Sequence, residues 1–232
     1  KRLLLLLEYA PRGNLWDYMI SNGPTLGKQL WTKWAYQIAG ALSCIHSCGI
    51  VHHDIKPHNT LLSENLDVKI ADFGNACFSS PQEPIASTVT LEGSQSFPPL
   101  DDGLGRGTQA YSAPEMLSPP TIYSFPVDVY SVGVTLITLT TGVEPFSLAR
   151  NSVHMIMGIK KGFFESGLQA ERQEQWKFLN KQLIGNNLKK SLIDMVSLNP
   201  LNRPKANEIS GIIEVSLEKD LLEENLNKTQ TA

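Results

Sequence analysis

Cysteine is scarce in this sequence, with three residues among 232. An odd number of cysteines spread over a long chain cannot build a disulfide framework, which excludes a small disulfide-stapled domain. We expect Cys44, Cys48 and Cys77 to be free thiols in a reducing compartment, and so an intracellular protein, cytoplasmic or nuclear. Cys44 and Cys48 could share a metal ion, but no second ligand pair follows at zinc-finger spacing.

Long apolar runs and an excess of one charge are also missing. The longest apolar stretch, residues 127–143, contains Asp128 and several Ser and Thr residues, and falls short of the roughly twenty apolar residues that a membrane span needs. Lys and Arg number 20 against 23 Asp and Glu, a formal charge of −3. A charge so near zero gives no electrostatic case for nucleic acid or a membrane as partner. The sequence gives no warrant for an oligomer.

The chain opens on an apolar run at residues 3–7 that no turn or cap precedes. The run is too short for a signal peptide and lacks a cleavage pattern, so it predicts a buried strand over residues 3–8. Because this strand begins almost at Lys1, which is not methionine, we expect the chain to be the middle of a longer protein.

Apolar periodicity predicts a helix-rich unit with a few strands. Asn14 follows a turn at residues 10–13 and is a suitable N-cap for a short helix. The clearest pattern covers residues 30–45, where apolar side chains recur at three- and four-residue steps until Gly49. Short strands are expected at residues 50–51, 61–62 and 68–70, and further helices over residues 127–141, 153–161, 188–197 and 206–217. Strands followed by many helices indicate an α+β fold.

Two segments lack such periodicity. Residues 79–107 are rich in Ser, Pro and Gly, so we expect an exposed, mobile loop longer than most connections. Residues 218–232 are charged and then polar, and are expected to fray. We therefore place the domain at residues 1–217 and a polar tail at residues 218–232.

The run VHHDIKPHN at residues 51–59 places a carboxylate, an ammonium and a carboxamide within six positions of one loop. Phosphoryl transfer needs an acceptor for the substrate hydroxyl, a cation for the transferred oxygens and an oxygen ligand for Mg²⁺. Asp54, Lys56 and Asn59 supply these three groups. Thirteen positions after Asn59, Asp72-Phe73-Gly74 follows a predicted strand and offers a second Mg²⁺ ligand.

These two motifs resemble the catalytic loop H-R-D-x-K-x-x-N and the D-F-G of the eukaryotic protein kinase family. The run GTQAYSAPE at residues 107–115 looks like the family's segment ending in A-P-E, and DVYSVG at residues 128–133 resembles the buried helix that follows. Arg203 fits the arginine that pairs with the A-P-E glutamate, Glu115. The resemblance covers residues 1–217 and implies an α+β, protein kinase-like fold. It corresponds to the hinge and the mainly helical C-terminal lobe, with short strands around the catalytic loop and the small N-terminal lobe absent from this chain.

The resemblance implies ATP- and Mg²⁺-dependent phosphoryl transfer to Ser or Thr hydroxyls of protein substrates. Asp54 would accept or orient the substrate hydroxyl, Lys56 would contact the γ-phosphate, and Asn59 and Asp72 would bind Mg²⁺. A lysine two positions after the catalytic aspartate, together with Thr108, resembles serine/threonine rather than tyrosine kinases.

On the nucleotide side, Leu7 would be the gatekeeper and the backbone of Glu8 and Ala10 would bind adenine. Leu61 would form the floor under the base, and Asn14 belongs to the same cofactor-binding group. A further group would hold the site together, with a buried Asp128 tying down the backbone of the catalytic loop and Glu115 paired with Arg203. Its members are His52, Phe73, Gly74, Glu115, Asp128 and Arg203.

The resemblance fails at two places. His53 replaces the arginine that normally neutralises a phosphate on the activation segment, and histidine is a weaker, pH-dependent cation. We therefore expect activity independent of phosphorylation there, although Ser79, Ser80, Ser87, Thr88 and Thr90 are available acceptors. The glycine-rich loop, the strand lysine and its partner glutamate are also missing, so this chain alone should bind ATP weakly and transfer phosphate poorly or not at all.

Three alternatives stay open. A pseudokinase or scaffold module would use the same fold only for binding, but the four catalytic-loop and D-F-G side chains argue against it. A small-molecule kinase is disfavoured by the A-P-E segment and Arg203. His52, His53 and His58 are metal-ligand types, although adjacent residues seldom point at one ion.

Overall fold

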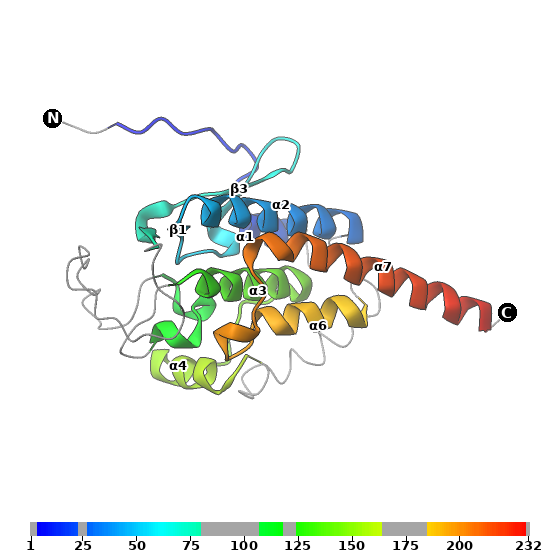
Figure 1. Cartoon of the computed structure of the whole chain (residues 1–232). Coiled ribbons are helices and arrows are strands. Elements are labelled where there is room, and N and C mark those ends of the chain that lie inside the picture. Colours follow the sequence, from blue (N-terminus) through cyan, green and yellow to red (C-terminus); the bar gives the residue numbers. More distant parts are fainter. Residues whose placement is uncertain (1–3, 23–26, 80–106, 118–123, 164–184, 231–232) are drawn as a thin grey trace.

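The computed structural model of this chain describes residues 4–22, 27–79, 107–117, 124–163 and 185–230. Within these ranges the molecule is a helical body with short strands along one side (Figure 1). The α+β architecture expected from the sequence is confirmed. Among the described residues, no helix combines the length and the apolar character needed to cross a bilayer.

Two helices open the described body. Helix α1 (Leu15–Asn22) begins after Asn14, whose Oδ1 accepts the N–H of Asp17 at 2.8 Å, as a helix N-cap does. Helix α2 (Lys28–Ser47) buries one apolar stripe that includes Trp31, Trp34 and Ile38. The chain turns away at Gly49, whose φ of +72° suits a residue without a Cβ. Both helices lie where the sequence predicts them.

The strands are very short and form two antiparallel pairs. Strand β2 (Thr60–Leu62) pairs with β3 (Val68–Ile70), as the sequence pattern suggests for neighbouring strands. Strand β1 (Ile50–Val51) pairs instead with β4 (Cys77–Phe78), which the sequence pattern does not reveal. The β1–β4 pairing joins the two ends of residues 50–78, and the β2–β3 pair lies between them in the sequence.

Helix α3 (Phe125–Thr141) forms the centre of the body, and all of its residues from Val127 to Thr141 are buried. Gly133 marks its closest approach to helix α6 (Asn186–Met195), because a Cβ there would stand 2.8 Å from the Cβ of Met195. The longest apolar stretch of the sequence is therefore a buried core helix.

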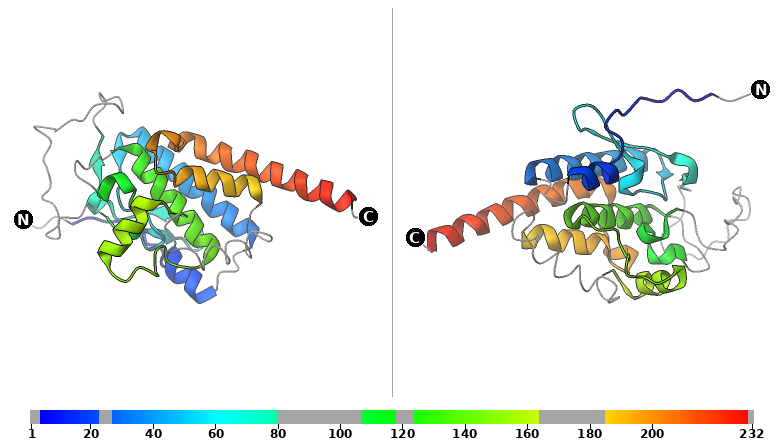
Figure 2. Two further views of the ribbon diagram at one scale, coloured as in Figure 1. Left: turned by 90° about the horizontal axis from the view of Figure 1, so that it is seen from below. Right: turned by 180° about the vertical axis from the view of Figure 1, so that it is seen from behind.

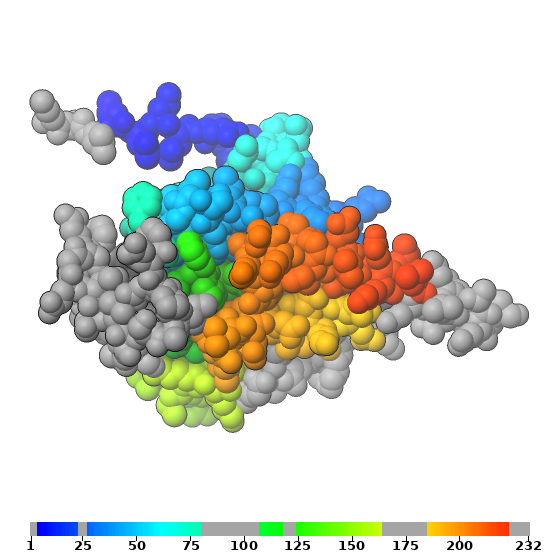
Figure 3. Space-filling view, in the orientation of Figure 1, coloured from blue at the N-terminus to red at the C-terminus, as the bar shows by residue number. Residues whose placement is uncertain are grey.

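Helices α4 (Ser152–Lys161), α6 and α7 (Ala206–Gln230) complete the body. Figure 3 shows α2, α7 and α6 side by side on one face, in agreement with the contacts of α7 with both neighbours. The end of α7 projects from the body in both views of Figure 2.

Helix α7 continues without a break to Gln230, through residues that the sequence predicts to fray. A buried contact explains part of this extension. Asp220 is 2% exposed and accepts N–H groups of Asn187 and Leu188 at the start of α6. Although the sequence beyond residue 217 is mostly polar, one residue there, Asp220, is buried and hydrogen-bonded to the start of α6.

The predicted buried strand at residues 3–8 is wrong for the described residues 4–8. They form no strand pairing and extend away from the helical body, and Leu6 is 97% exposed. An apolar run becomes a buried strand only when another strand and a core cover it. The described strands of this chain pair among themselves and leave residues 4–8 uncovered.

Candidate active site

Asp54 is the centre of a hydrogen-bonded cluster in the loop between β1 and β2. Its Oδ2 accepts the ammonium of Lys56 at 3.0 Å and the Nδ2 amide of Asn59 at 2.9 Å. Its Oδ1 accepts the backbone N–H of Thr108 at 2.9 Å. Lys56 also donates to the hydroxyl of Thr108. Three further sequence-predicted residues, Lys56, Asn59 and Thr108, therefore meet around the buried carboxylate of Asp54, which charge-assisted hydrogen bonds hold in place.

The segment that carries Thr108 approaches the catalytic loop very closely. Gly107 has a φ of +85°, and an added Cβ at this position would overlap the carbonyl oxygen of His53. His53 itself has a φ of +68°, in the left-handed region that few residues other than glycine adopt. Both residues adjoin the cluster, so unusual backbone conformations occur on either side of the Asp54–Thr108 contact.

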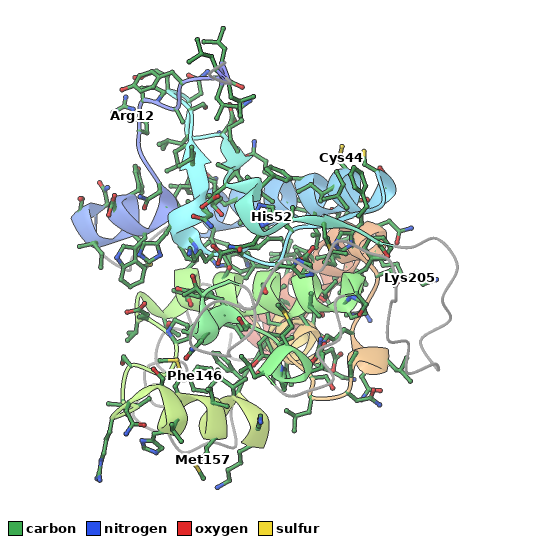
Figure 4. The ribbon with its side chains drawn as sticks, turned by 90° about the vertical axis from the view of Figure 1, so that its left-hand side faces the viewer. Arg12, Cys44, His52, Phe146, Met157 and Lys205 are labelled. Carbon is green, nitrogen blue, oxygen red and sulfur yellow. The ribbon has the colours of Figure 1, made fainter. Side chains whose placement is uncertain are left out.

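Asp128 fastens the catalytic loop to the first turn of α3. Its two carboxylate oxygens accept the backbone N–H groups of His52 and His53, each at 2.8 Å. The Nε2 atom of His46, in the last turn of α2, lies 2.9 Å from Asp128 Oδ2. The carboxylate is fully buried, and these three donors supply the partners that such a group needs. Figure 4 shows the loop at His52 between α2 and α3.

Asp72 lies in the exposed turn after β3, at a φ of +63°. Its Oδ1 accepts the N–H of Gly74 at 3.2 Å, and Phe73 lies edge-on to the His52 ring at 4.6 Å between ring centroids. The N–H of Ala71 donates to the backbone oxygen of Asn59 at 2.8 Å, which sets this turn beside the catalytic loop. The D-F-G turn is thus joined to the loop through backbone and ring contacts.

The three histidines of the loop have separate partners. His52 donates from Nε2 to the Ala71 carbonyl, His53 donates from Nδ1 to the Asn75 carbonyl, and His58 stacks on Trp16. Burial lowers the pKa of His52 and of His58, although nearby carboxylates oppose that shift. Across the described ranges, no three His, Cys, Asp or Glu side chains gather as metal ligands would.

Cys44 and Cys48 are free thiols on the surface of α2, and the Cys44 side chain points away from the body in Figure 4. Cys77 also forms no disulfide and is half-buried. The structure thus places these three cysteines outside any disulfide bond, as the sequence suggests.

On the expected nucleotide side, the structure brings Asn14 and Leu61 together in an isolated β-bridge. The side chain of Asn14 caps α1: its Oδ1 accepts the N–H of Asp17 and its Nδ2 donates to the Asp17 carboxylate. Glu8 forms an ion pair with Lys69 of β3 at 3.2 Å. The Ala10 carbonyl accepts the N–H of Gly13 at 3.3 Å. Leu7 is largely exposed and lies outside this group.

Glu115 and Arg203 form a bidentate ion pair across 88 positions of sequence. The two guanidinium nitrogens donate to the two carboxylate oxygens at 2.6 and 2.9 Å. Arg203 also donates to the backbone oxygens of Ser197 and Pro126, and its guanidinium lies over the ring of Tyr130. The pair therefore joins the segment after Thr108 to α3 and to the turn before α7.

Sequence reasoning missed three contributors to this site: His46, Asn75 and the close approach of Gly107. His46 lies in the last turn of α2, and nothing in the neighbouring sequence indicates that its partner is a carboxylate 82 positions away. Asn75 acts through its backbone oxygen, which side-chain patterns do not report. The candidate phosphorylation acceptors Ser80, Ser87, Thr88 and Thr90 lie outside the described residues.

Comparisons with known proteins point to one family. The family model of the protein kinase domain matches residues 1–211. A probable serine/threonine-protein kinase of Saccharomyces cerevisiae, KCC4, is 33% identical over 164 residues, which cover 70% of this chain and 14% of that protein. The CBL-interacting serine/threonine-protein kinase 20 of Arabidopsis thaliana is 34% identical over 166 residues, covering 71% of this chain and 34% of its own length.

The mouse serine/threonine-protein kinase SIK1 is 33% identical over 144 residues, which cover 62% of this chain and 16% of the relative. The chain thus spans between about a seventh and a third of the length of these relatives. The family match extends over most of the chain and includes every residue of the Asp54 cluster. This chain belongs to the protein kinase domain family.

Proposed function

We propose that the protein containing this chain transfers the γ-phosphoryl group of ATP to Ser or Thr hydroxyls of protein substrates. The observation that carries the proposal is the cluster of Asp54, Lys56, Asn59 and Thr108. A carboxylate fixed by three donors and flanked by an ammonium can orient an acceptor hydroxyl and neutralise a transferred phosphoryl group. The Ser/Thr kinases among the relatives support the same acceptor.

ATP and Mg²⁺ are the cofactors that this proposal requires. The Nδ2 of Asn59 is committed to Asp54, so its carbonyl oxygen is the atom left to bind a cation, and Asp72 offers an exposed carboxylate. Oxygen ligands of this type suit Mg²⁺, which would neutralise charge on the phosphates when bound. Asp54 would receive or orient the proton of the acceptor hydroxyl, and Lys56 would contact the transferred group.

The binding of His53 to the Asn75 carbonyl supports a second part of the proposal. This contact connects the catalytic loop to the segment after the D-F-G motif without a phosphate group. Activity then does not require phosphorylation of the activation segment, and treatment of active protein with a phosphatase should leave the rate unchanged. A loss of activity after such treatment would show this part to be wrong.

The test uses a polypeptide that includes the natural sequence upstream of Lys1, with labelled γ-phosphate, Mg²⁺ and a Ser/Thr protein substrate. The Asp54→Asn variant should lose transfer, because the amide no longer accepts a proton. Glu64→Gln, which alters an exposed ion pair with Arg12, is the control and should keep full activity. Equal background transfer by wild type and Asp54→Asn would instead favour a pseudokinase or scaffold module.

The same assay on residues 1–232 alone addresses the shorter chain. We propose that it binds ATP weakly, because Leu7 and Glu8 are exposed and Ala10 is only half-buried. We also propose an intracellular setting, cytoplasmic or nuclear, with protein substrates rather than nucleic acid or a membrane as partners. The free thiols and the formal charge of −3 support that setting.

A further inference from the structure

Helix α4 has one face in the core and an apolar ridge on the opposite side. Ile159 is buried, and Ile156 packs against the core. Val153 and Met157 are four positions apart, and so are neighbours on the helix surface, and they are 67% and 65% exposed. Figure 4 shows the Met157 side chain pointing away from the body. The ridge of Val153 and Met157 is therefore open to a partner.

Cations stand at both ends of this ridge. The backbone N–H of Arg150 donates to Nδ1 of His154 at 3.2 Å, which holds Arg150 beside the first turn of α4. Lys160 and Lys161 form the last turn, three and four positions beyond Met157. All three cationic residues are exposed, and none of the ion pairs among the described residues involves them. Helix α4 contains no Asp or Glu, so its exposed side is basic in a chain with a formal charge of −3.

The position of α4 relates this ridge to the candidate active site. The helix contacts the short helical turns Gln109–Tyr111 and Pro114–Leu117, which follow Thr108 in the chain. Thr108 in turn donates its backbone N–H to Asp54. Figure 1 shows α4 directly beside this segment. A polypeptide held on α4 would therefore lie close to the segment that borders the Asp54 cluster.

We propose that the Val153–Met157 ridge is a docking surface for an acidic segment of the protein substrate that carries apolar anchor residues. Two apolar side chains of that segment would pack on Val153 and Met157, where methionine adapts to differently shaped partners. Carboxylates flanking them would meet Arg150 at one end and the two lysines at the other. Docking there would raise the effective concentration of the acceptor hydroxyl near Asp54. The role in substrate binding rests on the proposed function, whereas the binding chemistry of the ridge does not.

The observations favour a peptide over an anionic membrane as the occupant. Membrane binding by a surface helix scales with the apolar area that it buries and with its attraction to anionic lipids. Two exposed apolar side chains and three cations provide little of either, in a chain whose formal charge is negative. The same groups are enough to fix the position and direction of a short acidic peptide.

The binding experiment uses residues 1–232 and a synthetic helical peptide with two leucines four positions apart between pairs of glutamates. Met157→Ser should weaken binding about tenfold, because an apolar anchor loses its contact surface. Lys160→Glu should weaken binding by a similar factor, because it places like charges together. Leu222→Ser and Lys219→Glu make the same changes at exposed positions of α7 and should leave the affinity unchanged. Equal affinities of wild type and Met157→Ser would overturn the proposal.

Two further probes test the chemistry of the occupant. A peptide with lysines in place of the glutamates should not bind, and binding as tight as that of the acidic peptide would overturn the charge complementarity. Vesicles containing phosphatidylserine should not sediment the protein. Sedimentation that Met157→Ser abolishes, without binding of the acidic peptide, would overturn the proposal in favour of a membrane surface.

The kinetic experiment uses the polypeptide that includes the sequence upstream of Lys1, with a Ser/Thr substrate fused to the acidic peptide or to its lysine counterpart. The acidic fusion should lower KM for the protein substrate about tenfold at similar kcat, and Met157→Ser should remove that difference. Equal KM values for the two fusions would overturn the role in substrate docking. No transfer with either fusion would refute the proposed function, and peptide binding to residues 1–232 would still decide the chemistry of the ridge.

Discussion

Gly107 lies against the carbonyl oxygen of His53, at a distance that leaves no room for a Cβ. The contact joins two segments 54 positions apart and stands beside the bond from Thr108 to Asp54. The φ of +85° at Gly107 adds a second requirement for glycine, because side chains strain this conformation. Steric and conformational constraints thus coincide at one residue.

We predict that Gly107→Ala displaces the segment from the catalytic loop. The left-handed conformation alone costs roughly 1–3 kcal/mol, and the overlap with His53 adds to it. Urea unfolding should show reduced stability, and transfer activity should fall with it. The matched control is Gly211→Ala, at an exposed site in α7 with open space around it, which should gain about 1 kcal/mol in stability. Equal behaviour of the two variants would contradict this account of Gly107.

Helix positions and the meeting of Asp54, Lys56 and Asn59 in one loop could be predicted from the sequence, for related reasons. A helix buries one stripe, so the periodicity of Trp31, Trp34 and Ile38 is visible in a short window. Asp54, Lys56 and Asn59 lie within six positions and need only one loop to meet. These parts of the molecule can therefore be predicted from short stretches of the sequence.

Contacts between distant segments could not be predicted in the same way. The pairing of β1 with β4 involves two residues on each side, too few for a period to appear. The hydrogen bond of His46 to Asp128 spans 82 positions. The leucines at residues 4–7 have the composition of a buried strand, but burial depends on what else packs there and not on the run itself.

Breaking the Glu115–Arg203 pair should be strongly destabilising. Arg203→Met would leave the mostly buried carboxylate of Glu115 without its bidentate partner, at a cost of about 3–5 kcal/mol. Glu115→Gln should cost less, because the amide oxygen can still accept one N–H. Urea unfolding of both single variants and of the double variant measures the coupling. If the single losses simply add up, the two residues do not act as a pair.

Asp220 provides a test of where the folded unit ends. Asp220→Ala removes the acceptor for Asn187 and Leu188 and leaves N–H groups at the start of α6 unpaired, at a cost of about 1–3 kcal/mol. Glu218→Ala, an exposed position on the same helix, should change stability little. Thermal unfolding checks both variants. An unchanged midpoint for Asp220→Ala would support the predicted boundary at residue 217 rather than a longer domain.

His52 should make stability depend on pH. Burial lowers its pKa in the folded state below the ordinary value of 6.5, so the unfolded chain binds the proton more tightly. Stability from this group is therefore complete above about pH 6.5 and falls as the pH drops below it toward the lowered pKa. Urea unfolding of wild type and His52→Gln at pH 7.5 and 5.5 isolates the effect. The variant should lose less stability between the two pH values, and an equal loss would contradict the prediction.

Asp128 binds the catalytic loop only through main-chain N–H groups. The contacts are made by the backbone N–H groups of residues 52 and 53. Both contacts are therefore kept whether residue 53 is histidine, as here, or arginine. Proline is the one residue type that lacks this donor, and its fixed φ also conflicts with the conformation at His53. The loop can therefore change its side-chain chemistry at residue 53 while its attachment to α3 stays the same, whereas position 128 has no such freedom.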